Sequence, residues 1–341
     1  MRLFLPGLLL MCMAIFSGCG FDQPKSDQDN GSDSAAITLV RLNEDIEKDR
    51  KNPDLYNQRS KFYLNDLEFD KALKDINTAI SLNEKNPAFY ITLSDIQLFL
   101  GQSQSCMDAL NQALSLDPAD DEARLKLAKL YLILKNHSRT FQVLNEMIKQ
   151  DEYNPKAYFL RAIALLEKGD TTRAVGDLMK AADQDQQYFE AYLQLGELFS
   201  LSNDPLAEGY MTNALRIKPA SKEALYMLGM YYQNTGQYDK AFITYDRLSK
   251  AAPDFRNAPY NKGYIYLVYL NDFPKAIDAF TNAIRIDSGY VDAWFNRGYA
   301  FELNGQLKEA YKDYQKTLGL DVNNERAIEG LNRLDKSALR K

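Results

Sequence analysis

Few residues in this chain have side chains suited to catalysis or metal binding. Among its 341 residues there is one histidine, His137, and there are three cysteines, Cys12, Cys19 and Cys106. With a single histidine, placed in an expected turn, neither a histidine-based triad nor a two-histidine metal site is predicted. The sequence also lacks a Gly-x-Ser-x-Gly motif, a phosphate-binding loop and any cluster with metal-ligand spacing. We therefore expect no catalytic residue, no metal site and no cofactor.

The charge of the chain argues against a nucleic-acid partner. It carries 41 lysines and arginines and 47 aspartates and glutamates, giving a net charge of −6, without a long basic run. Nucleic-acid binders usually concentrate their basic residues in one patch or stripe. A hydrophobic share of 45% with 26% charged residues is typical of a folded protein. We expect a folded chain that binds neither nucleic acid nor a small-molecule cofactor.

The amino terminus has the pattern of an export signal. Residues 3–16 form an apolar stretch that is too short to cross a bilayer comfortably but suits a secretory signal peptide. The following Phe16-Ser17-Gly18-Cys19 resembles the lipobox of bacterial lipoproteins, with phenylalanine where that family usually has leucine. The resemblance implies a signal peptide over residues 1–18 and a lipid attached to Cys19. The alternative, a signal cut elsewhere that releases a soluble protein, stays open.

An acidic segment separates Cys19 from the rest of the chain. Residues 20–35 contain four aspartates and one lysine among Ser, Gln and Gly, so residues 19–36 are predicted to be the lipidated cysteine and a flexible linker. Two or more acyl chains give stable anchoring. Gly20 follows the cysteine, where some inner-membrane lipoproteins have aspartate. We expect a lipid-anchored protein of a Gram-negative cell envelope, at the outer membrane, and leave its periplasmic or surface face open.

A period of 34 residues organises most of the chain. Small residues recur at the eighth and twentieth places of each repeat, and large apolar or aromatic residues recur at the twenty-fourth. Two antiparallel helices approach closely only where neither carries bulk, so these places predict helix crossings. The repeats cover residues 53–86, 87–120, 121–154, 155–188, 189–221, 222–255, 256–290 and 291–324.

The repeats resemble the tetratricopeptide repeat. The eighth repeat matches that family's pattern best, with Trp294, Gly298, Phe301, Gly305, Ala310 and Tyr314. The resemblance implies an all-α fold, a right-handed α-solenoid of eight helix–turn–helix repeats over residues 37–341, with caps at 37–52 and 325–341. One departure concerns the seventh place, where the leucine of the family is replaced by Arg59, Arg161, Lys262 and Arg297.

In this family the first helices of the repeats line a concave channel, reached from places two, five, six, nine, twelve and thirteen. The last three repeats concentrate there the partner-binding candidates Tyr226, Met230, Tyr260, Asn261, Tyr264, Phe295, Asn296 and Tyr299. One interpretation is ordinary packing between neighbouring first helices. The other is an aromatic groove for an extended peptide or a partner's helix, in which the two asparagines hydrogen-bond a peptide backbone. Both interpretations stay open.

The resemblances together imply a binding protein and no enzyme. We predict a membrane-anchored scaffold or adaptor, tethered by lipid at Cys19, that binds a protein or peptide partner in the concave face. The alternative is a lipoprotein that binds a peptide or a glycan as a solute in the aromatic channel. The identity of the partner stays open.

Overall fold

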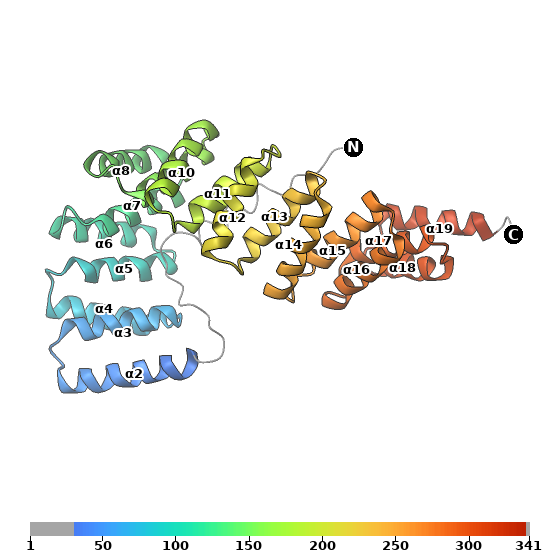
Figure 1. Cartoon of the computed structure of the whole chain (residues 1–341). Coiled ribbons are helices and arrows are strands. Elements are labelled where there is room, and N and C mark those ends of the chain that lie inside the picture. Colours follow the sequence, from blue (N-terminus) through green and yellow to red (C-terminus); the bar gives the residue numbers. More distant parts are fainter. Residues whose placement is uncertain (1–30, 339–341) are drawn as a thin grey trace. The chain divides into compact units, whose positions relative to one another are not determined.

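The computed structural model describes residues 31–338, with side chains from 38 to 335, and every regular element in that range is a helix (Figure 1). The predicted α-solenoid of helical repeats is confirmed. The first helices of the repeats are α3 (Pro53–Asn65), α5 (Pro87–Phe99), α7 (Asp121–Ile133), α9 (Pro155–Glu167), α11 (Phe189–Ser200), α13 (Lys222–Asn234), α15 (Asn257–Tyr264) and α17 (Val291–Leu303). The second helices are α4 (Phe69–Leu82), α6 (Ser103–Leu116), α8 (His137–Gln150), α10 (Thr171–Gln184), α12 (Leu206–Ile217), α14 (Tyr238–Ala251), α16 (Phe273–Ile286) and α18 (Leu307–Leu320). Helix α2 (Gly31–Lys48) precedes them and α19 (Glu325–Ala338) follows.

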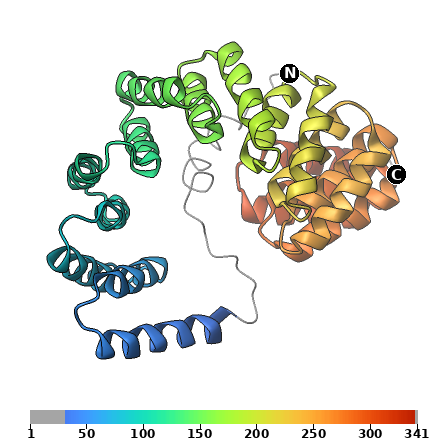
Figure 2. The same ribbon diagram turned by 60° about the vertical axis from the view of Figure 1, so that its left-hand side comes forward.

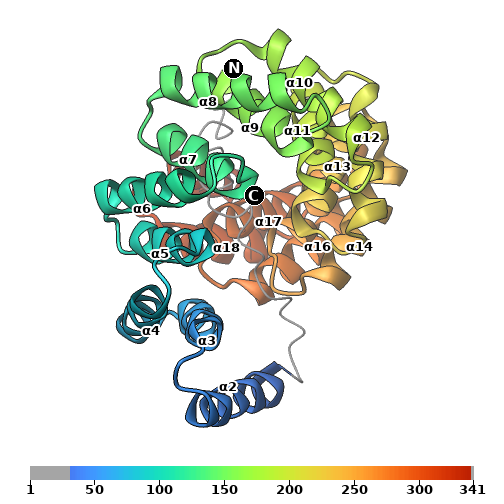
Figure 3. The ribbon, with the colours of Figure 1, turned by 90° about the vertical axis from the view of Figure 1, so that its left-hand side faces the viewer.

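The chain divides into two compact units, each described by itself. The N-terminal unit ends at Asp185 and contains α2 to α10, whereas the C-terminal unit begins at Gln186 and contains α11 to α19. Within each unit the two helices of a repeat pack on each other, and the second helix packs on the first helix of the next repeat. Figure 3 shows the pairs α3/α4, α5/α6 and α7/α8 of the N-terminal unit in succession, and Figure 2 shows α2, in blue, at the start of this series.

Helix starts explain part of the repeat pattern. Prolines open α3, α5 and α9, where the missing N–H would have had no helical partner. The asparagine before each proline caps the helix, because its side-chain oxygen accepts a hydrogen bond from a backbone N–H two or three residues later. The caps are Asn52, Asn86 and Asn154. These residues therefore set where the repeats begin.

The small eighth place and the large twenty-fourth place of a repeat are one packing contact. A Cβ atom added to Gly229 would lie 2.5 Å from the ring of Tyr245, and one added to Gly263 would lie 2.8 Å from the ring of Phe280. Both rings are fully buried. The first helix must be small at this point because the ring from the second helix of the same repeat occupies the space.

Arginine at the seventh place bridges two second helices. In the eighth repeat Arg297 donates from Nε and Nη2 to the two carboxylate oxygens of Asp313, at 2.7 and 2.8 Å. Its Nη1 donates to Thr281 Oγ1, in the second helix of the preceding repeat, at 3.1 Å. The same bidentate bridge joins Arg59 to Asp75 and Arg161 to Asp177. Where arginine replaces the family's leucine at the seventh place, an aspartate is therefore present in the second helix of the same repeat to bind it.

The partner of the seventh place lies sixteen residues further along the chain. In the second repeat the seventh place is Leu93, and the residue sixteen positions later is the uncharged Ala109. The seventh repeat is an intermediate case. Its additional residue puts Ala279, seventeen residues after Lys262, at the equivalent position, and Lys262 donates instead to Asp246 of the preceding repeat at 2.5 Å. An aspartate at this spacing was the sequence signal for the bridges.

The seventh repeat absorbs its additional residue inside a helix. Helix α15 continues as a π-helix, η1 (Ile265–Leu270), and ends at Asn271 with φ 52°. A π-helical turn holds one more residue than an α-helical turn, so the register of the following helix is preserved. Asparagine tolerates the left-handed conformation at the end better than most residues do.

Two predictions for the amino terminus, the signal peptide over residues 1–18 and the lipid on Cys19, lie outside the described residues and stay predictions. Helix α2 begins at Gly31, ahead of the cap predicted from residue 37, so the last part of the predicted linker is helical. The strong helix formers Ala35 and Ala36 favour this extension. None of the described helices is both long and apolar enough to cross a membrane.

Candidate functional site

The candidate residues occupy three consecutive first helices of the C-terminal unit. Asn261, Phe295 and Asn296 are buried, and the other five are half-buried. Helix α13 carries Tyr226 and Met230, α15 carries Tyr260, Asn261 and Tyr264, and α17 carries Phe295, Asn296 and Tyr299. The structure therefore places all eight in one series of helices and separates an inner set from a surface set.

The two asparagines connect neighbouring helices. Asn261 Nδ2 donates to the hydroxyl of Tyr245 and lies 3.2 Å from both that oxygen and the sulfur of Met230. Asn296 Nδ2 donates to the hydroxyl of Tyr260 at 2.9 Å. Since these amide donors already bind side chains of the preceding repeat, the packing interpretation describes the two asparagines better than a role in binding a peptide backbone.

The aromatic candidates pack against one another while keeping part of their surface exposed. The rings of Phe295 and Tyr299 are stacked, with centroids 6.3 Å apart and planes 8° from parallel. The ring of Tyr260 lies 4.8 Å from that of Tyr290, and the ring of Tyr226 meets Phe255 edge-on at 5.3 Å. Such contacts fix the ring orientations, so the exposed edges form a rigid surface. The same aromatic side chains therefore pack between neighbouring helices and contribute to the exposed surface.

The hydroxyls of Tyr260 and Tyr290 stay protonated at neutral pH. Burial raises the pKa of Tyr260 above its ordinary value, and it raises the pKa of Tyr290 to about 12. The hydroxyl of Tyr290 donates to Asn257 Oδ1 at 3.2 Å. These two tyrosines therefore offer neutral hydroxyl groups and ring faces, which suit binding.

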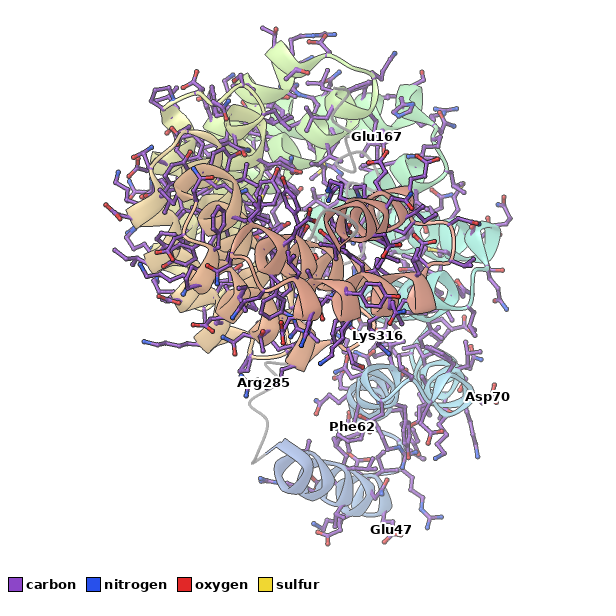
Figure 4. The ribbon with its side chains drawn as sticks, turned by 90° about the vertical axis from the view of Figure 1, so that its right-hand side faces the viewer. Glu47, Phe62, Asp70, Glu167, Arg285 and Lys316 are labelled. Carbon is purple, nitrogen blue, oxygen red and sulfur yellow. The ribbon has the colours of Figure 1, made fainter. Side chains whose placement is uncertain are left out.

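Charges in repeats five to eight are sorted between the two helices of a repeat. The first helices carry five acidic residues, all at places that the family directs into the channel, and no lysine or arginine at those places. The second helices carry many of the basic residues, as Arg285 on α16 and Lys316 on α18 illustrate (Figure 4). The five acids are Glu190, Glu197, Glu223, Asp292 and Glu302. The candidate face is thus acidic as well as aromatic.

Helix α19 supplies cations to the last part of this face. Arg326 Nη2 donates to Asp292 Oδ1 at 2.6 Å, and its guanidinium carbon lies 4.6 Å from the centre of the Phe295 ring. Arg333 donates to both carboxylate oxygens of Glu302 at 2.9 Å and lies 5.9 Å from the ring centre of Tyr299. Each arginine therefore pairs with a carboxylate and covers an aromatic ring at the same time.

Glu302 is the centre of a polar contact between α17, α18 and α19. It accepts hydrogen bonds from Arg333 and from the hydroxyl of Tyr314 at 2.5 Å. Burial alone would raise the pKa of Glu302, but the hydrogen bonds from Arg333 and Tyr314 outweigh it and the pKa is lowered. The carboxylate is therefore ionised throughout the neutral range and holds α19 in place.

The sequence interpretation missed these two arginines. Continuing the period past Asn324 puts Arg326 and Arg333 at the second and ninth places of a ninth repeat, of which α19 is the first helix. That register was the available signal. In the N-terminal unit the corresponding face is mixed in charge, since Lys126 donates to Asp95 at 2.7 Å between α7 and α5.

His137 and Cys106 have structural surroundings. His137, predicted in an exposed turn, instead starts α8, and its half-buried ring lies 2.9 Å from Glu167 Oε2 because the end of α9 packs beside it. Cys106 is buried, which raises the pKa of its thiol to about 11. Over the range that the structure describes, no group of three or more His, Cys, Asp or Glu side chains is arranged to hold a metal ion.

Comparison with known families agrees with this fold. Models described as Tetratricopeptide repeat match residues 87–120, 223–254 and 291–324. The chain therefore contains tetratricopeptide repeats. Among solved structures, the C-terminal part of a TPR repeat-containing protein from Cytophaga hutchinsonii is 17% identical, with a TM-score of 0.50, and the match covers 80% of this chain and 98% of that one. This likeness concerns the fold.

Curated relatives share only part of their length with this chain. The DnaJ homolog subfamily C member 7 homolog of Dictyostelium discoideum is 26% identical over 210 residues, which is 56% of this chain and 39% of that protein. RNA polymerase II-associated protein 3 of Xenopus tropicalis is 33% identical over 108 residues, 32% of this chain and 16% of that protein. The chain spans less than half the length of either relative, so the similarity concerns only part of each of those proteins.

Proposed function

We propose that this chain is a membrane-anchored scaffold or adaptor in the cell envelope of a Gram-negative bacterium, and not an enzyme. Its partner is a polypeptide that binds on the first helices of the repeats. The tetratricopeptide repeats support the binding role. The anchor rests on the resemblance of the segment around Cys19 to a lipobox.

The observation that carries the proposal is the half-buried aromatic surface of α13, α15 and α17. Tyrosine buries a large ring area on binding while its hydroxyl stays hydrogen-bonded, and it loses little conformational entropy. Here the rings are already held by their neighbours, as Tyr299 is by Phe295. A surface ordered in advance loses less entropy when a partner docks.

A second candidate is a lipoprotein that binds a peptide or a glycan as a solute. The same surface supports it, because exposed tyrosine rings stack on sugar rings as well as on side chains. The two functions differ in the size of the ligand and in whether a stable complex with one protein forms.

Capture experiments with the lipidated full-length chain separate the two. The chain and its Tyr264→Ala/Tyr299→Ala variant are used to capture partners from membranes of the source cell in mild detergent. Tyr311→Ala, an exposed tyrosine on the second helix α18, is the matched control. The scaffold is supported if one defined protein is no longer captured by the double variant but is still captured by Tyr311→Ala. Unchanged protein partners, together with lost binding of a peptide or glycan, support solute binding.

The anchor is tested by Cys19→Ala. We expect this variant to move from the membrane fraction to the soluble fraction of the envelope, because the acyl chains are its attachment. Continued membrane retention of a folded Cys19→Ala variant would refute the lipoprotein proposal while leaving the binding proposal intact.

A further inference from the structure

Glu197 on α11 differs from the other carboxylates of the acidic aromatic face. Among the described residues its hydrogen-bond partner is Gln194, whose Nε2 donates at 2.9 Å, and no lysine or arginine lies in ion-pair range. Burial raises the pKa of Glu197, since the neutral amide compensates only part of the lost hydration. The residue holds the ninth place, which the family directs into the channel.

The remaining acids of this face are paired or exposed. Asp292 and Glu302 bind the arginines of α19, as described above. Glu190 on α11 pairs with Lys218 at 3.2 Å. Glu223 at the start of α13 is exposed and accepts a hydrogen bond from Ser221 Oγ at 3.1 Å. Among the described residues, Glu197 is therefore the half-buried carboxylate of this face that forms no ion pair with a lysine or arginine of the chain.

Helix α19 shows which chemistry this face accepts. Arg333 holds the ninth place of its helix, pairs with a carboxylate of the preceding first helix and lies over the ring of Tyr299. Arg326 repeats the arrangement with Asp292 and Phe295. The face thus binds both arginine side chains in the same way, with a carboxylate and an aromatic ring. At α11 and α13, which contact each other, the same types of group are present as Glu197 and Tyr226.

We propose that the partner segment is a cationic extended peptide, and that Glu197 binds one of its lysine or arginine side chains. This inference rests on the proposed function and names the class of its partner. The charged end of the ligand side chain pairs with Glu197, and its aliphatic part packs on the surface that Tyr226 and Met230 contribute from α13. Glu223, at the second place of α13, adds negative potential along the same face.

The charge distribution also decides against other occupants. An acidic peptide, a nucleic acid or an anionic lipid headgroup would meet carboxylates on the first helices of repeats five to eight, which have no lysine or arginine at their channel places. The two arginines that α19 adds to this face are already paired with Asp292 and Glu302. Bringing like charges together opposes binding, whereas a cationic segment is attracted before contact and gains ion pairs afterwards. Charge complementarity therefore selects the cationic peptide.

The test uses the full chain and two short fluorescein-labelled peptides of defined composition. One contains serine, leucine and lysine, and the other has glutamate in place of every lysine. Binding is followed by fluorescence anisotropy at physiological salt. We expect the lysine peptide to bind at least tenfold more tightly than the glutamate peptide, and Glu197→Gln to weaken it about tenfold, the effect of a lost hydrogen-bonded charge.

Two controls make the outcome specific. Glu309→Gln removes an exposed carboxylate of the second helix α18 and should leave binding unchanged. Glu197→Gln should unfold at an equal or higher denaturant concentration than wild type, because a partly desolvated charge is removed, so weaker binding would not reflect misfolding.

Equal binding of both peptides, binding of neither, or an equal loss in Glu197→Gln and Glu309→Gln would overturn the inference. The proposed function would survive any of these results if Tyr264→Ala/Tyr299→Ala still lost a captured protein partner. Failure of both measurements would remove the proposed function as well.

Discussion

The bidentate bridge between Arg297 and Asp313 gives a quantitative prediction. Arg297→Leu restores the residue that the tetratricopeptide family has at the seventh place, yet we expect it to destabilise this chain. Asp313 keeps only 6% of its side chain exposed and Arg297 keeps 15%. Removing one partner of a buried ion pair costs about 3–5 kcal/mol, and the partial exposure of the arginine reduces our expectation to about 2–4 kcal/mol.

The double variant Arg297→Leu/Asp313→Ala should recover most of this loss. It recreates the combination of Leu93 and Ala109 in the second repeat. Burial raises the pKa of Asp313 even though Arg297 lowers it, so the charged pair only partly offsets its lost hydration. Apolar replacements of such pairs are often neutral or stabilising. We expect the double variant to lie within about 1 kcal/mol of wild type.

Urea unfolding followed by circular dichroism, with amide hydrogen exchange of α17 and α18, measures these differences. Hydrogen exchange is needed because repeats open partly independently, so a global midpoint averages over them. Arg285→Leu, at an exposed arginine on α16, is the control and should change stability by less than about 0.5 kcal/mol. A cost below about 1 kcal/mol for Arg297→Leu, or a double variant as unstable as the single one, would refute the reasoning.

Three further predictions follow from local packing and charge. Gly229→Ala should destabilise the C-terminal unit by about 2 kcal/mol because its Cβ would meet the opposing tyrosine ring at 2.5 Å. Gly176→Ala, which has open space around it, should stabilise the chain by about 0.5 kcal/mol. Both changes are measured as shifts of the urea midpoint. The lowered pKa of Glu302 means that its pairing with Arg333 is complete above the ordinary glutamate value of about 4.3 and is lost as the pH falls below it. The protection of the α19 amides against hydrogen exchange, measured relative to the intrinsic exchange rate at each pH, should therefore fall below about pH 4, and in Arg333→Ala it should already be low at pH 7. Cys106, with its pKa raised to about 11, should resist a thiol reagent at pH 8 until the chain is unfolded; rapid labelling of the folded chain would contradict its burial.

The repeat pattern predicted the fold well because it is encoded locally. A small residue at the eighth place and a large apolar or aromatic residue at the twenty-fourth recur along the repeats, and they report one packing contact, as Gly263 and Phe280 show. The additional residue of the seventh repeat was visible as a change in period, but its accommodation as η1 was not. A single inserted residue can be absorbed in a turn or in a helix, and only the neighbouring packing selects between them.

The candidate site was predicted in part. The aromatic side chains lie on the first helices as the family's places imply, yet Asn261 and Asn296 bind neighbouring hydroxyls. Their amides were equally consistent with a peptide ligand, since the sequence shows which place a residue holds and not which atom it meets. The cations that cover Phe295 and Tyr299 come from α19, a helix that the sequence marked only as a cap.

The repeat, its helices and the places of the aromatic candidates could be read from the sequence, because they depend on residue type and periodicity along the chain. The pairing of charges, in contrast, follows from how the helices pack. This packing joins Arg297 to Asp313 and Arg333 to Glu302 and leaves Glu197 with a neutral amide. Partner choice depends on the distance and desolvation between side chains of different helices, and those quantities exist only once the helices have packed.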